Sequence, residues 1–199
     1  MFKRVENELE LAMFNGVWTT VWREKGFDLE FSAHALERLM VVTEEGHYVG
    51  TAELKPYSAA STINETGFFQ EHPELILAQG ETAEIDKIAL LKPYRGQQYI
   101  SELLSSLIYT AEERQIKYFV SLLEPVFSRA LRVTFKLPLD KLGEKVFYKG
   151  DYVVPMIFNV EQIYANKQKY AWLSYSQQTF TTQISNAGAR EESAELFKL

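Results

Sequence analysis

The stretch from Glu84 to Leu123 constrains the fold of this chain more than any other. It begins as an apolar strand, turns sharply at Pro93–Gly96, continues as a helix and ends in a second apolar strand that starts at Tyr118. A strand–helix–strand unit of this length places its two strands parallel in one sheet. The other strand patterns lie in hairpins, which are antiparallel. We therefore predict a mixed, mostly antiparallel sheet flanked by helices, an α/β (α+β) architecture.

The other elements follow from periodicity and turn residues. Apolar residues at three- and four-residue steps predict a helix over 8–25, broken near Gly16 or ended at Gly26. A turn at Glu44–His47 between two apolar runs predicts a hairpin. The remaining expected elements are a loop at 55–66, a short helix within 68–77, strands at 83–91, 118–123, 145–148 and 153–160, and helices at 97–114 and 126–134.

Composition excludes several classes of protein. The chain of 199 residues has no cysteine, which excludes disulfides, thiolate zinc sites and cysteine nucleophiles. Its net charge of −6 argues against a general nucleic-acid binder, because phosphate contacts need a basic face. The N-terminus is charged and lacks the apolar core of a signal peptide, and no apolar run reaches membrane-spanning length. We expect a cytoplasmic protein.

The turn at 93–96 has the features of an anion site. The first amides of a helix have no partner within the helix, and the helix dipole attracts negative charge to them. Arg95 adds a cation at this place, and Gly96 lets the backbone approach a ligand closely. The pattern predicts a phosphate site. A plain turn with a solvent-exposed arginine is the simpler alternative.

The order of elements and the residues of this turn together resemble the GNAT superfamily of acyltransferases, over residues 8–160. That superfamily carries a Gln/Arg-x-x-Gly-x-Gly/Ala loop whose amides hold the pyrophosphate of coenzyme A. Arg95 stands at its first position, and Gln98 and Ile100 replace its two later small residues. The resemblance implies an acyl-CoA or acyl-carrier-protein donor and no metal. The residues implied to bind the donor are Ile88, Leu90, Arg95, Gly96, Gln97, Gln98, Tyr99 and Ile100.

Two further segments are similar to one branch, the N-acyl amino acid synthases and acyl-homoserine-lactone synthases, which often take acyl-carrier protein as donor. Glu84–Lys87 resembles the Glu-x-x-Arg strand motif of the lactone synthases, and Gly50–Pro56 resembles their Gly-x-x-Arg-Leu-x-Pro segment. Glu53 and Lys87 stand where that branch has partner-binding arginines, which argues against lactone synthesis. The resemblance implies transfer of an acyl group larger than acetyl to an amine.

Two carboxylates on the strand before the turn are the candidate catalytic residues. Transfer from a thioester to an amine needs a base for the amine and a hydrogen-bond donor for the thioester oxygen. The resemblance implies that Glu84 is the base, and Asp86, on the same face of the strand, is the alternative. A surface glutamate paired with Lys87 is the purely structural interpretation of Glu84.

The departing thiolate has no evident proton donor. Many GNAT enzymes place an acidic tyrosine in the short helix after the fifth strand, where this chain has Ala130. Three interpretations stay open. The thiolate leaves without a side-chain acid, or Tyr148 or Tyr152 comes in from elsewhere, or the protein is inactive.

Three aromatic residues of the first helix, Phe14, Trp18 and Trp22, share one face and can line an acyl pocket. A stripe at this spacing is also typical of a hydrophobic core. The three histidines lie far apart and lack the paired spacing of a metal-binding helix, so we predict no metal site.

We predict one acyltransferase domain over 1–160 and a C-terminal extension over 161–199, rich in aromatic residues and expected to be helical. The predicted activity is transfer of an acyl group from acyl-CoA or acyl-carrier protein to a small-molecule amine by direct attack. The alternatives are an inactive GNAT-like protein that binds an acyl thioester and a module that docks a protein partner. The sequence leaves open the acceptor, the acyl chain length, the choice of donor and whether the chain forms a homodimer.

Overall fold

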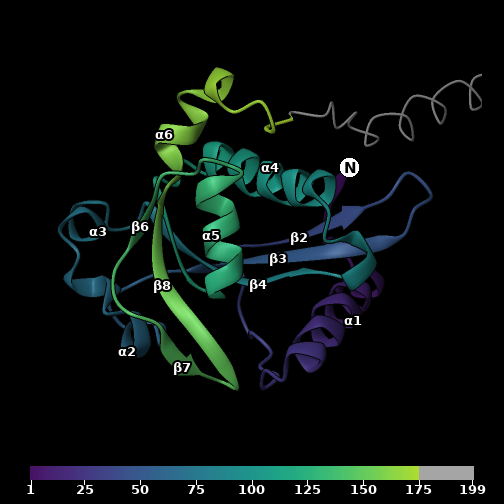
Figure 1. The fold of residues 1–199 in the computed structure, drawn as a ribbon, viewed down its shortest axis with the longest axis horizontal. Helices are drawn as coiled ribbons and strands as arrows, with labels where there is room; N and C mark the ends of the chain where they lie inside the picture. Colours follow the sequence, from purple (N-terminus) through teal and green to yellow (C-terminus); the bar gives the residue numbers. More distant parts are fainter. Residues whose placement is uncertain (175–199) are drawn as a thin grey trace, which may run out of the picture.

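The computed structural model describes residues 1–174 (Figure 1). Within them, eight strands form the sheet: β1 (Phe2–Arg4), β2 (Glu37–Val42), β3 (Tyr48–Pro56), β4 (Thr82–Leu90), β5 (Tyr118–Leu123), β6 (Leu139–Lys141), β7 (Val146–Tyr148) and β8 (Asp151–Asn159). The α-helices are α1 (Glu8–Lys25), α2 (Asn64–Gly67), α3 (Pro73–Leu77), α4 (Gln97–Glu113), α5 (Pro125–Val133) and α6 (Val160–Tyr164). Short 3₁₀ helices occupy Phe69–Glu71, Lys92–Tyr94 and Lys167–Lys169.

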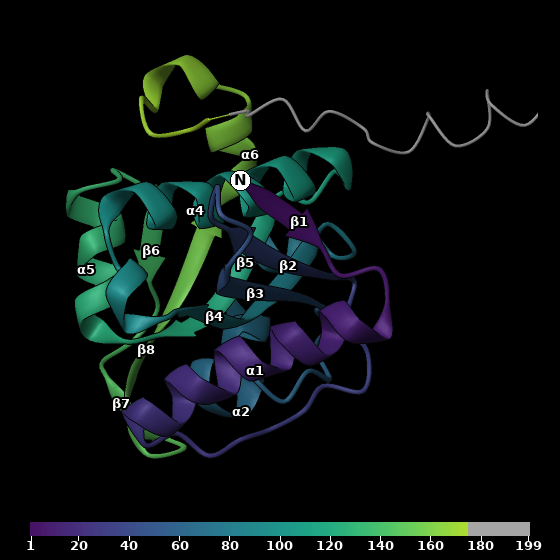
Figure 2. The ribbon, with the colours of Figure 1, turned by 90° about the vertical axis from the view of Figure 1, so that its right-hand side faces the viewer.

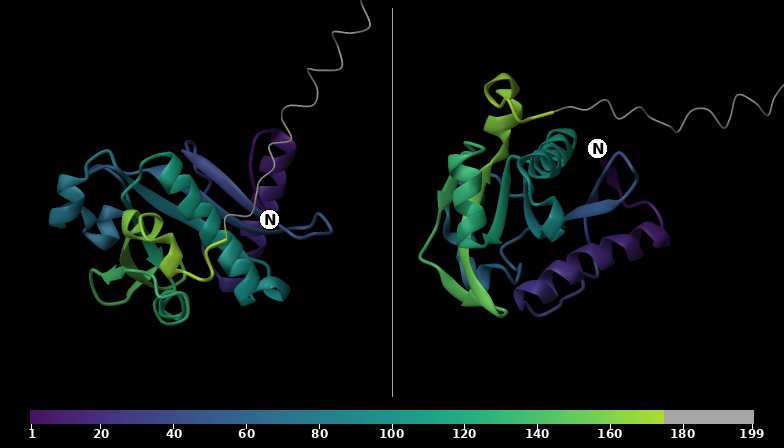
Figure 3. Two further views of the ribbon diagram at one scale, coloured as in Figure 1. Left: turned by 90° about the horizontal axis from the view of Figure 1, so that it is seen from above. Right: turned by 45° about the vertical axis from the view of Figure 1, so that its right-hand side comes forward.

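The sheet has the order β1-β2-β3-β4-β5-β8-β6, and β7 pairs with β8. All of these pairs are antiparallel except β4 and β5, which α4 connects in parallel. Helices α4, α5 and α6 pack on one face of the sheet. Helix α1 and the α2–α3 segment pack on the other face, so that α1 and α4 lie on opposite sides in Figure 2 and in the right-hand view of Figure 3. The predicted mixed, mostly antiparallel sheet between helices is confirmed.

Helix α1 begins and ends where local sequence signals place it. The side chain of Asn7 accepts a hydrogen bond from the Glu10 amide at 3.0 Å and caps the first turn. Gly26 ends the helix with a φ of 80°, a left-handed conformation that glycine adopts readily. Gly16 does not break the helix. The helix therefore crosses β2, β3 and β4 in one piece and brings its last turn to the opening described below.

Helix α4 packs on the opposite face of β2 and β3. Five apolar residues on one side of the helix are buried: Leu103, Leu104, Leu107, Ile108 and Ala111. Burial of this stripe fixes the rotation of the helix. It therefore also fixes the turn at 93–96 next to the end of β4.

The hairpin of β2 and β3, strand β5 and helix α5 also lie where the sequence predicts them. The structure adds two strands, β1 and β6, that were not predicted, and each has three residues at an edge of the sheet. Three residues are too few for an alternating pattern to be recognised. In the 68–77 segment, Pro73 starts α3 instead of breaking a helix, because the first turn needs no amide hydrogen bond from it.

The parallel pair of β4 and β5 stays hydrogen-bonded over only three residues. Thr82–Glu84 pairs with Tyr118–Val120, and beyond this point the two strands are no longer paired with each other. The Ser121 hydroxyl donates to the Ile85 carbonyl at 3.0 Å just after the last paired residues. Lys87 has a φ of 49° at a bulge opposite β3, which bends β4 locally. The sheet therefore opens between these two strands.

The described part of the C-terminal extension packs on the domain. Val160 and Ile163 of α6 are completely buried in the main core. The Trp172 Nε1 donates to the Phe135 carbonyl at 2.8 Å, which fastens the segment after α6 to the core. The division at residue 160 stays a prediction. The predicted helical character of residues 175–199 lies outside the described residues.

Candidate active site

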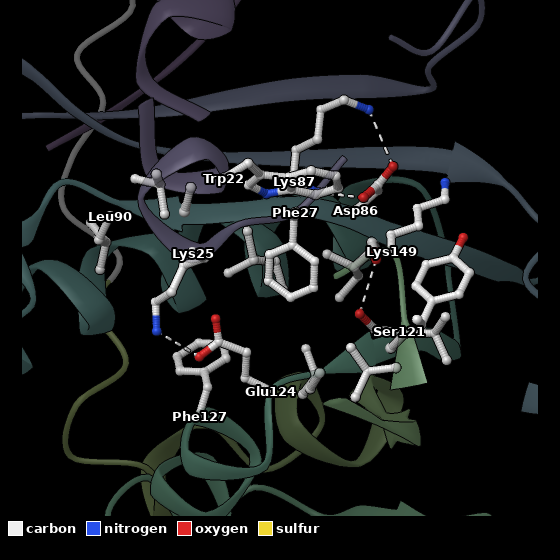
Figure 4. A pocket seen from close by; sticks show the side chains of 18 of the residues that line it. Trp22, Lys25, Phe27, Asp86, Lys87, Leu90, Ser121, Glu124, Phe127 and Lys149 are labelled. Carbon is white, nitrogen blue, oxygen red and sulfur yellow. Dashed lines mark hydrogen bonds and ion pairs between the residues drawn. The ribbon is translucent and has the colours of Figure 1, made fainter. Parts of the chain in front are cut away.

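A cavity of about 380 Å³ occupies the opening between β4 and β5 (Figure 4). Its lining comes from both faces of the sheet, with α1 on one side and α4 and α5 on the other. Apolar lining residues include Trp22, Phe27, Ile85, Ile88, Leu103, Leu122 and Phe127. Charged and polar lining residues include Lys25, Glu30, Lys55, Glu84, Asp86, Lys87, Arg95, Ser121, Glu124, Tyr148 and Lys149. We call the part of the cavity lined by the apolar residues the apolar passage; the charged and polar residues line the rest.

Glu84 and Asp86 both line this cavity, and Lys55 of β3 lies between them. Its Nζ is 2.5 Å from Glu84 Oε1 and 3.2 Å from Asp86 Oδ2. Burial raises the pKa of Glu84, although the Lys55 ammonium opposes this shift. Burial acts in the same direction on Asp86, but the ammonium groups of Lys55 and Lys87 outweigh it and hold the pKa of Asp86 below its usual value. Glu84 is therefore the carboxylate better suited to accept a proton at neutral pH.

Lys87 is not the partner of Glu84 that the sequence suggested, because it pairs with Glu53. The Lys87 Nζ lies 2.6 Å from Glu53 Oε1, and only 2% and 1% of the two side chains are exposed. Lys87 also donates to the Ser32 hydroxyl at 2.6 Å and lies 5.3 Å from the centre of the Trp18 ring. Glu53 and Lys87 stand where the lactone synthases have arginines that bind partners. Both side chains are almost completely buried here, so neither is exposed on the outer surface for a partner protein.

The turn before α4 leaves helix amides without partners in the helix. Gly96 caps α4 without a side-chain hydrogen bond, and the Ile100 amide is the first to donate back, to the Gly96 carbonyl. The amides of 97–99 are thus available to an anion. Four of the residues predicted to bind the donor line the cavity: Ile88, Leu90, Arg95 and Ile100. The other four form the turn and the first helical residues beside it: Gly96, Gln97, Gln98 and Tyr99.

The last turn of α1 contacts both walls of the opening. Arg95 donates from its two terminal nitrogens to the Glu24 carboxylate at 2.8 and 3.0 Å, and from Nε to the Leu90 carbonyl at 2.9 Å. These hydrogen bonds lower the pKa of Glu24. The Lys25 Nζ lies 3.0 Å from Glu124 at the end of β5 (Figure 4). The Arg95 guanidinium, which was predicted to bind phosphate, therefore lies at the turn. It is paired with the Glu24 carboxylate of α1.

Of the three aromatic residues predicted to line an acyl pocket, Trp22 lines the cavity and the other two do not. Phe14 and Trp18 are completely buried in a cluster with Met40 and Ala89, between α1 and the sheet. All three lie on the same side of α1, but the first two pack on continuous sheet. Trp22 comes one turn later, where the helix passes over the opening. Of the three, Trp22 therefore remains a candidate for the acyl pocket.

The hairpin of β7 and β8 closes one side of the cavity. The Asp28 amide donates to the Lys149 carbonyl at 3.0 Å, and the Lys149 Nζ pairs with Glu30. Gly150 has a φ of 110°, and a Cβ at this position would overlap the carbonyl oxygen of Gly26. A glycine is required both by this conformation and by this contact.

Tyr148 of β7 and Ala130 of α5 both line the cavity, whereas Tyr152 is 46% exposed and lies outside the lining. Burial, together with the charge of Asp86, raises the pKa of Tyr148. Its hydroxyl therefore keeps its proton at neutral pH. Of the two tyrosines considered from the sequence, Tyr148 is the one that lines the cavity.

The sequence interpretation missed Lys55, which contacts both candidate bases. The alternation of β3 places Glu53 and Lys55 on one face, so part of the signal was present. The pairing of Lys55 with Glu84 depends on the register between β3 and β4, which no local pattern reveals. The ion pairs of Lys25 with Glu124 and of Lys149 with Glu30 were missed for the same reason: Lys25, Glu30, Glu124 and Lys149 come from segments far apart in the chain.

Within residues 1–174, no group of three or more histidine, aspartate or glutamate side chains is placed to hold a metal ion. No helix in this part of the chain combines the length and the apolar character needed to cross a membrane.

Several solved structures share this fold. FeeM, an N-acyl amino acid synthase from uncultured soil microbes, is 14% identical with a TM-score of 0.64, over 81% of this chain and 91% of FeeM. The acyl-homoserine lactone synthase LasI is 15% identical with a TM-score of 0.61, over 80% and 88% of the two chains. MesI, a CoA-dependent acyl-homoserine lactone synthase, is 17% identical with a TM-score of 0.55, over 82% and 88%. At these identities the likeness concerns the fold alone.

No curated protein sequence matches the chain. The family model of the acetyltransferase (GNAT) family matches residues 6–132, which is more than half of the chain. The matched part runs from α1 to α5 and contains the whole β4–turn–α4–β5 unit that carried the resemblance. The fold neighbours include members of the branch to which the sequence is similar. The chain therefore belongs to the acetyltransferase (GNAT) family, and this membership confirms the prediction of an N-acyltransferase.

Proposed function

We propose that the chain transfers an acyl group from a pantetheine thioester, on coenzyme A or on an acyl-carrier protein, to the amine of a small molecule. One observation carries this proposal: Glu84 is a buried carboxylate with a raised pKa at the point where β4 and β5 separate. A thioester lying in the opening would present its carbonyl carbon close to this carboxylate. A base in that place is what direct attack by an amine requires.

The donor is proposed to enter from the side of α4. The amides of 97–99 and the guanidinium of Arg95 would bind its phosphate through charge-assisted hydrogen bonds. Past Glu84, β4 and β5 no longer pair with each other, and the Ile85 carbonyl accepts from the Ser121 hydroxyl. Backbone groups farther along the two strands would bond to the amides of a pantetheine arm. Ile88, Leu103 and Phe127 would then line the apolar part of its path.

In the proposed reaction a carbon–nitrogen bond replaces a carbon–sulfur bond, and protons move at the amine and at the departing sulfur. Glu84, directly or through water, takes a proton from the amine, and the nitrogen attacks the thioester carbonyl carbon. The tetrahedral intermediate collapses as the carbon–sulfur bond breaks, which gives an amide and a thiolate. Tyr148 would protonate the thiolate and regain its proton from solvent, to which Glu84 would release the proton that it accepted.

Asp86 remains the alternative base, but its surroundings support a different role. Lys55 and Lys87 both bond to it, and a lowered pKa makes a carboxylate a weaker proton acceptor. A permanently ionised carboxylate next to the base would instead attract a cationic amine to the cavity, where the amine gives one proton to solvent before the neutral form reacts and gives its second proton to Glu84.

The neighbours in fold guide the choice of substrates. FeeM is an N-acyl amino acid synthase, and MesI is a CoA-dependent acyl-homoserine lactone synthase. For this chain we propose a small acceptor with a primary amine and an acyl donor longer than acetyl. A carrier protein and coenzyme A both remain candidate carriers, and the proposed location is the cytoplasm, where both are found.

Two observations favour a second candidate function, an inactive member that binds an acyl thioester or a protein partner. Glu24 occupies the guanidinium of Arg95, and α5 has Ala130 where many GNAT enzymes have a tyrosine. Such a protein would bind a donor thioester without releasing its thiol.

Release of free thiol from octanoyl-CoA and octanoyl-carrier protein, with and without a panel of amino acids and other small amines, separates these candidates. We expect thiol release that depends on the amine, and a loss of about a hundredfold or more for Glu84→Gln at neutral pH. Glu81→Gln is the matched control, since Glu81 pairs with Lys117 outside the cavity. Donor binding without amine-dependent release would favour the inactive member. An unchanged rate for Glu84→Gln would transfer the role of base to Asp86.

A further inference from the structure

Charged side chains of β2, β3 and β4 are linked in a continuous row of alternating sign. Arg38 Nε lies 2.6 Å from Glu53 Oε2, and Glu53 Oε1 lies 2.6 Å from Lys87 Nζ. Lys87 Nζ lies 3.1 Å from Asp86 Oδ2. The row continues through Lys55 to Glu84. We call these six residues the ion chain: Arg38, Glu53, Lys87, Asp86, Lys55 and Glu84.

The ion chain ends in the cavity at Glu84, and this end position sets Glu84 apart. Glu53 and Asp86 each have two cationic neighbours within 3.2 Å, whereas Glu84 has one, Lys55. For Asp86, the two cations outweigh burial and hold its pKa below the usual value. At the end of the row the effect of burial dominates instead, and the pKa of Glu84 is raised.

We propose that Lys55 is a positioning residue that orients Glu84 for acyl transfer and sets the pH range in which Glu84 can act as base. The inference rests on the proposed function. The Lys55 Nζ lies 2.5 Å from Oε1 of Glu84. One carboxylate oxygen is thus held in place, which orients the group so that its other oxygen can accept a proton from the acceptor amine.

The backbone fixes this arrangement. Lys55 and Glu84 lie directly opposite each other in the antiparallel register of β3 and β4, and Glu53 lies opposite Asp86. Directly opposed residues on one face of a sheet bring their side chains together. Lys55 is half-buried, so its long side chain is restrained by the cavity wall as well as by the two carboxylates.

Several groups face Glu84 and act on its proton. The two lysines of the ion chain favour its charged form, and Asp86 disfavours it. Tyr57, which follows β3, and Tyr148 of β7 also face it. Burial raises the pKa of both tyrosines, so they stay neutral in the range in which a carboxylate titrates. Removal of Lys55 and removal of the Asp86 charge should therefore move the titration of Glu84 in opposite directions.

Two measurements on the full chain test this inference. One is the pH profile of kcat/KM with octanoyl-CoA and the amine that gives the fastest thiol release. The other is the titration of the ¹³C-labelled carboxyl of Glu84, without substrate, by nuclear magnetic resonance. For Lys55→Met we expect the acidic limb and the titration to move to higher pH, with lost activity recovered at higher pH. For Asp86→Asn we expect the acidic limb and the titration to move to lower pH. Lys55→Arg keeps the positive charge, so its pH profile should match that of the unaltered chain.

Shifts that are absent, or that have the same sign in the two variants, would overturn the inference. So would a rate loss in Lys55→Met that is equal at every pH, since that is the result of structural damage alone. If Lys55→Met fails to fold, Lys55→Gln and Asp86→Asn supply the same comparison. The titration needs no turnover, so it still tests Lys55 if Glu84→Gln retains full activity and the proposed base is wrong.

Discussion

The two ends of the cavity hold their charged groups in contrasting ways. At the β3–β4 end, the Glu53 and Lys87 side chains are almost completely buried and bonded to further charges on both sides. At the α4 end, Arg95 and Glu24 form an ion pair whose side chains are 33% and 37% exposed. Solvent can therefore replace either partner of the second pair but neither partner of the first.

This contrast matches what each end has to do in the proposed reaction. A base is effective when its orientation is fixed before the substrate arrives, and a buried row of charges provides that. A donor site must instead exchange one anion for another at each turnover. An exposed ion pair can separate to admit the donor phosphate at a small cost in free energy, because water solvates the two released charges.

The largest expected effect is on stability at the β3–β4 end. Glu53→Ala leaves Arg38 and the buried Lys87 without their shared partner, and we expect a loss of about 3–5 kcal/mol in the free energy of unfolding. Urea denaturation measures it. Glu53→Gln should lose less, because its amide oxygen can still accept from Lys87.

The control for this prediction is the exposed pair of Lys141 and Glu144. Glu144→Gln should leave the urea midpoint unchanged, since exposed ion pairs contribute little. A Glu53→Ala protein as stable as Glu144→Gln would remove the distinction between buried and exposed charges on which the comparison rests.

The next effect concerns the apolar passage that joins the two ends. Each methylene buried there should contribute about 0.8 kcal/mol, so four extra methylenes should favour binding by about 3 kcal/mol. Competitive binding across a series of acyl-CoA thioesters from acetyl upward measures this trend. Trp22→Ala should flatten the series. A best donor of acetyl-CoA would mean that the passage does not hold the acyl chain.

At the α4 end we expect a moderate effect on donor binding. Arg95→Glu should weaken the binding of octanoyl-CoA by about 1.5–3 kcal/mol, the contribution of a charge-assisted hydrogen bond. Isothermal titration calorimetry gives the dissociation constant. Lys141→Glu, an equal charge reversal on β6, should leave it unchanged. A dissociation constant that Arg95→Glu does not alter would rule out this turn as the phosphate site.

The smallest expected effect has the opposite sign. Glu24→Gln removes the anion that occupies Arg95, so the donor no longer competes with it. Octanoyl-CoA should bind more tightly than to the unaltered chain, by less than the change seen for Arg95→Glu, and with a steeper dependence on salt. Weaker binding would show that Glu24 supports the donor site instead of competing for it.

Local signals were sufficient for most of the fold. The cap at Asn7, the stop at Gly26 and the apolar stripe of α4 each depend on residues close together in the chain, and each element lies where it was predicted. The turn at Arg95 was located in the same way.

The candidate site could be predicted only in part. Glu84 and Asp86 were found because both stand on the strand before the turn. Lys55 and Glu24 were not found, because their contacts depend on strand register and on the course of α1 over the sheet. Phe14 and Trp18 were assigned to the acyl pocket together with Trp22, because all three lie on one side of α1. The sequence could not show that this side packs on the core at Phe14 and Trp18 and passes over the opening at Trp22.

The tight approach of Gly150 to the carbonyl of Gly26 joins two segments that leave the ribosome at very different times. Every member of the ion chain lies before residue 88, so the row of charges can form once β4 has been synthesised. Tyr148 and Lys149, which complete the cavity, are made much later and dock on the segment after α1. The residues that pair with the proposed base are therefore synthesised well before those that enclose the cavity around a thioester.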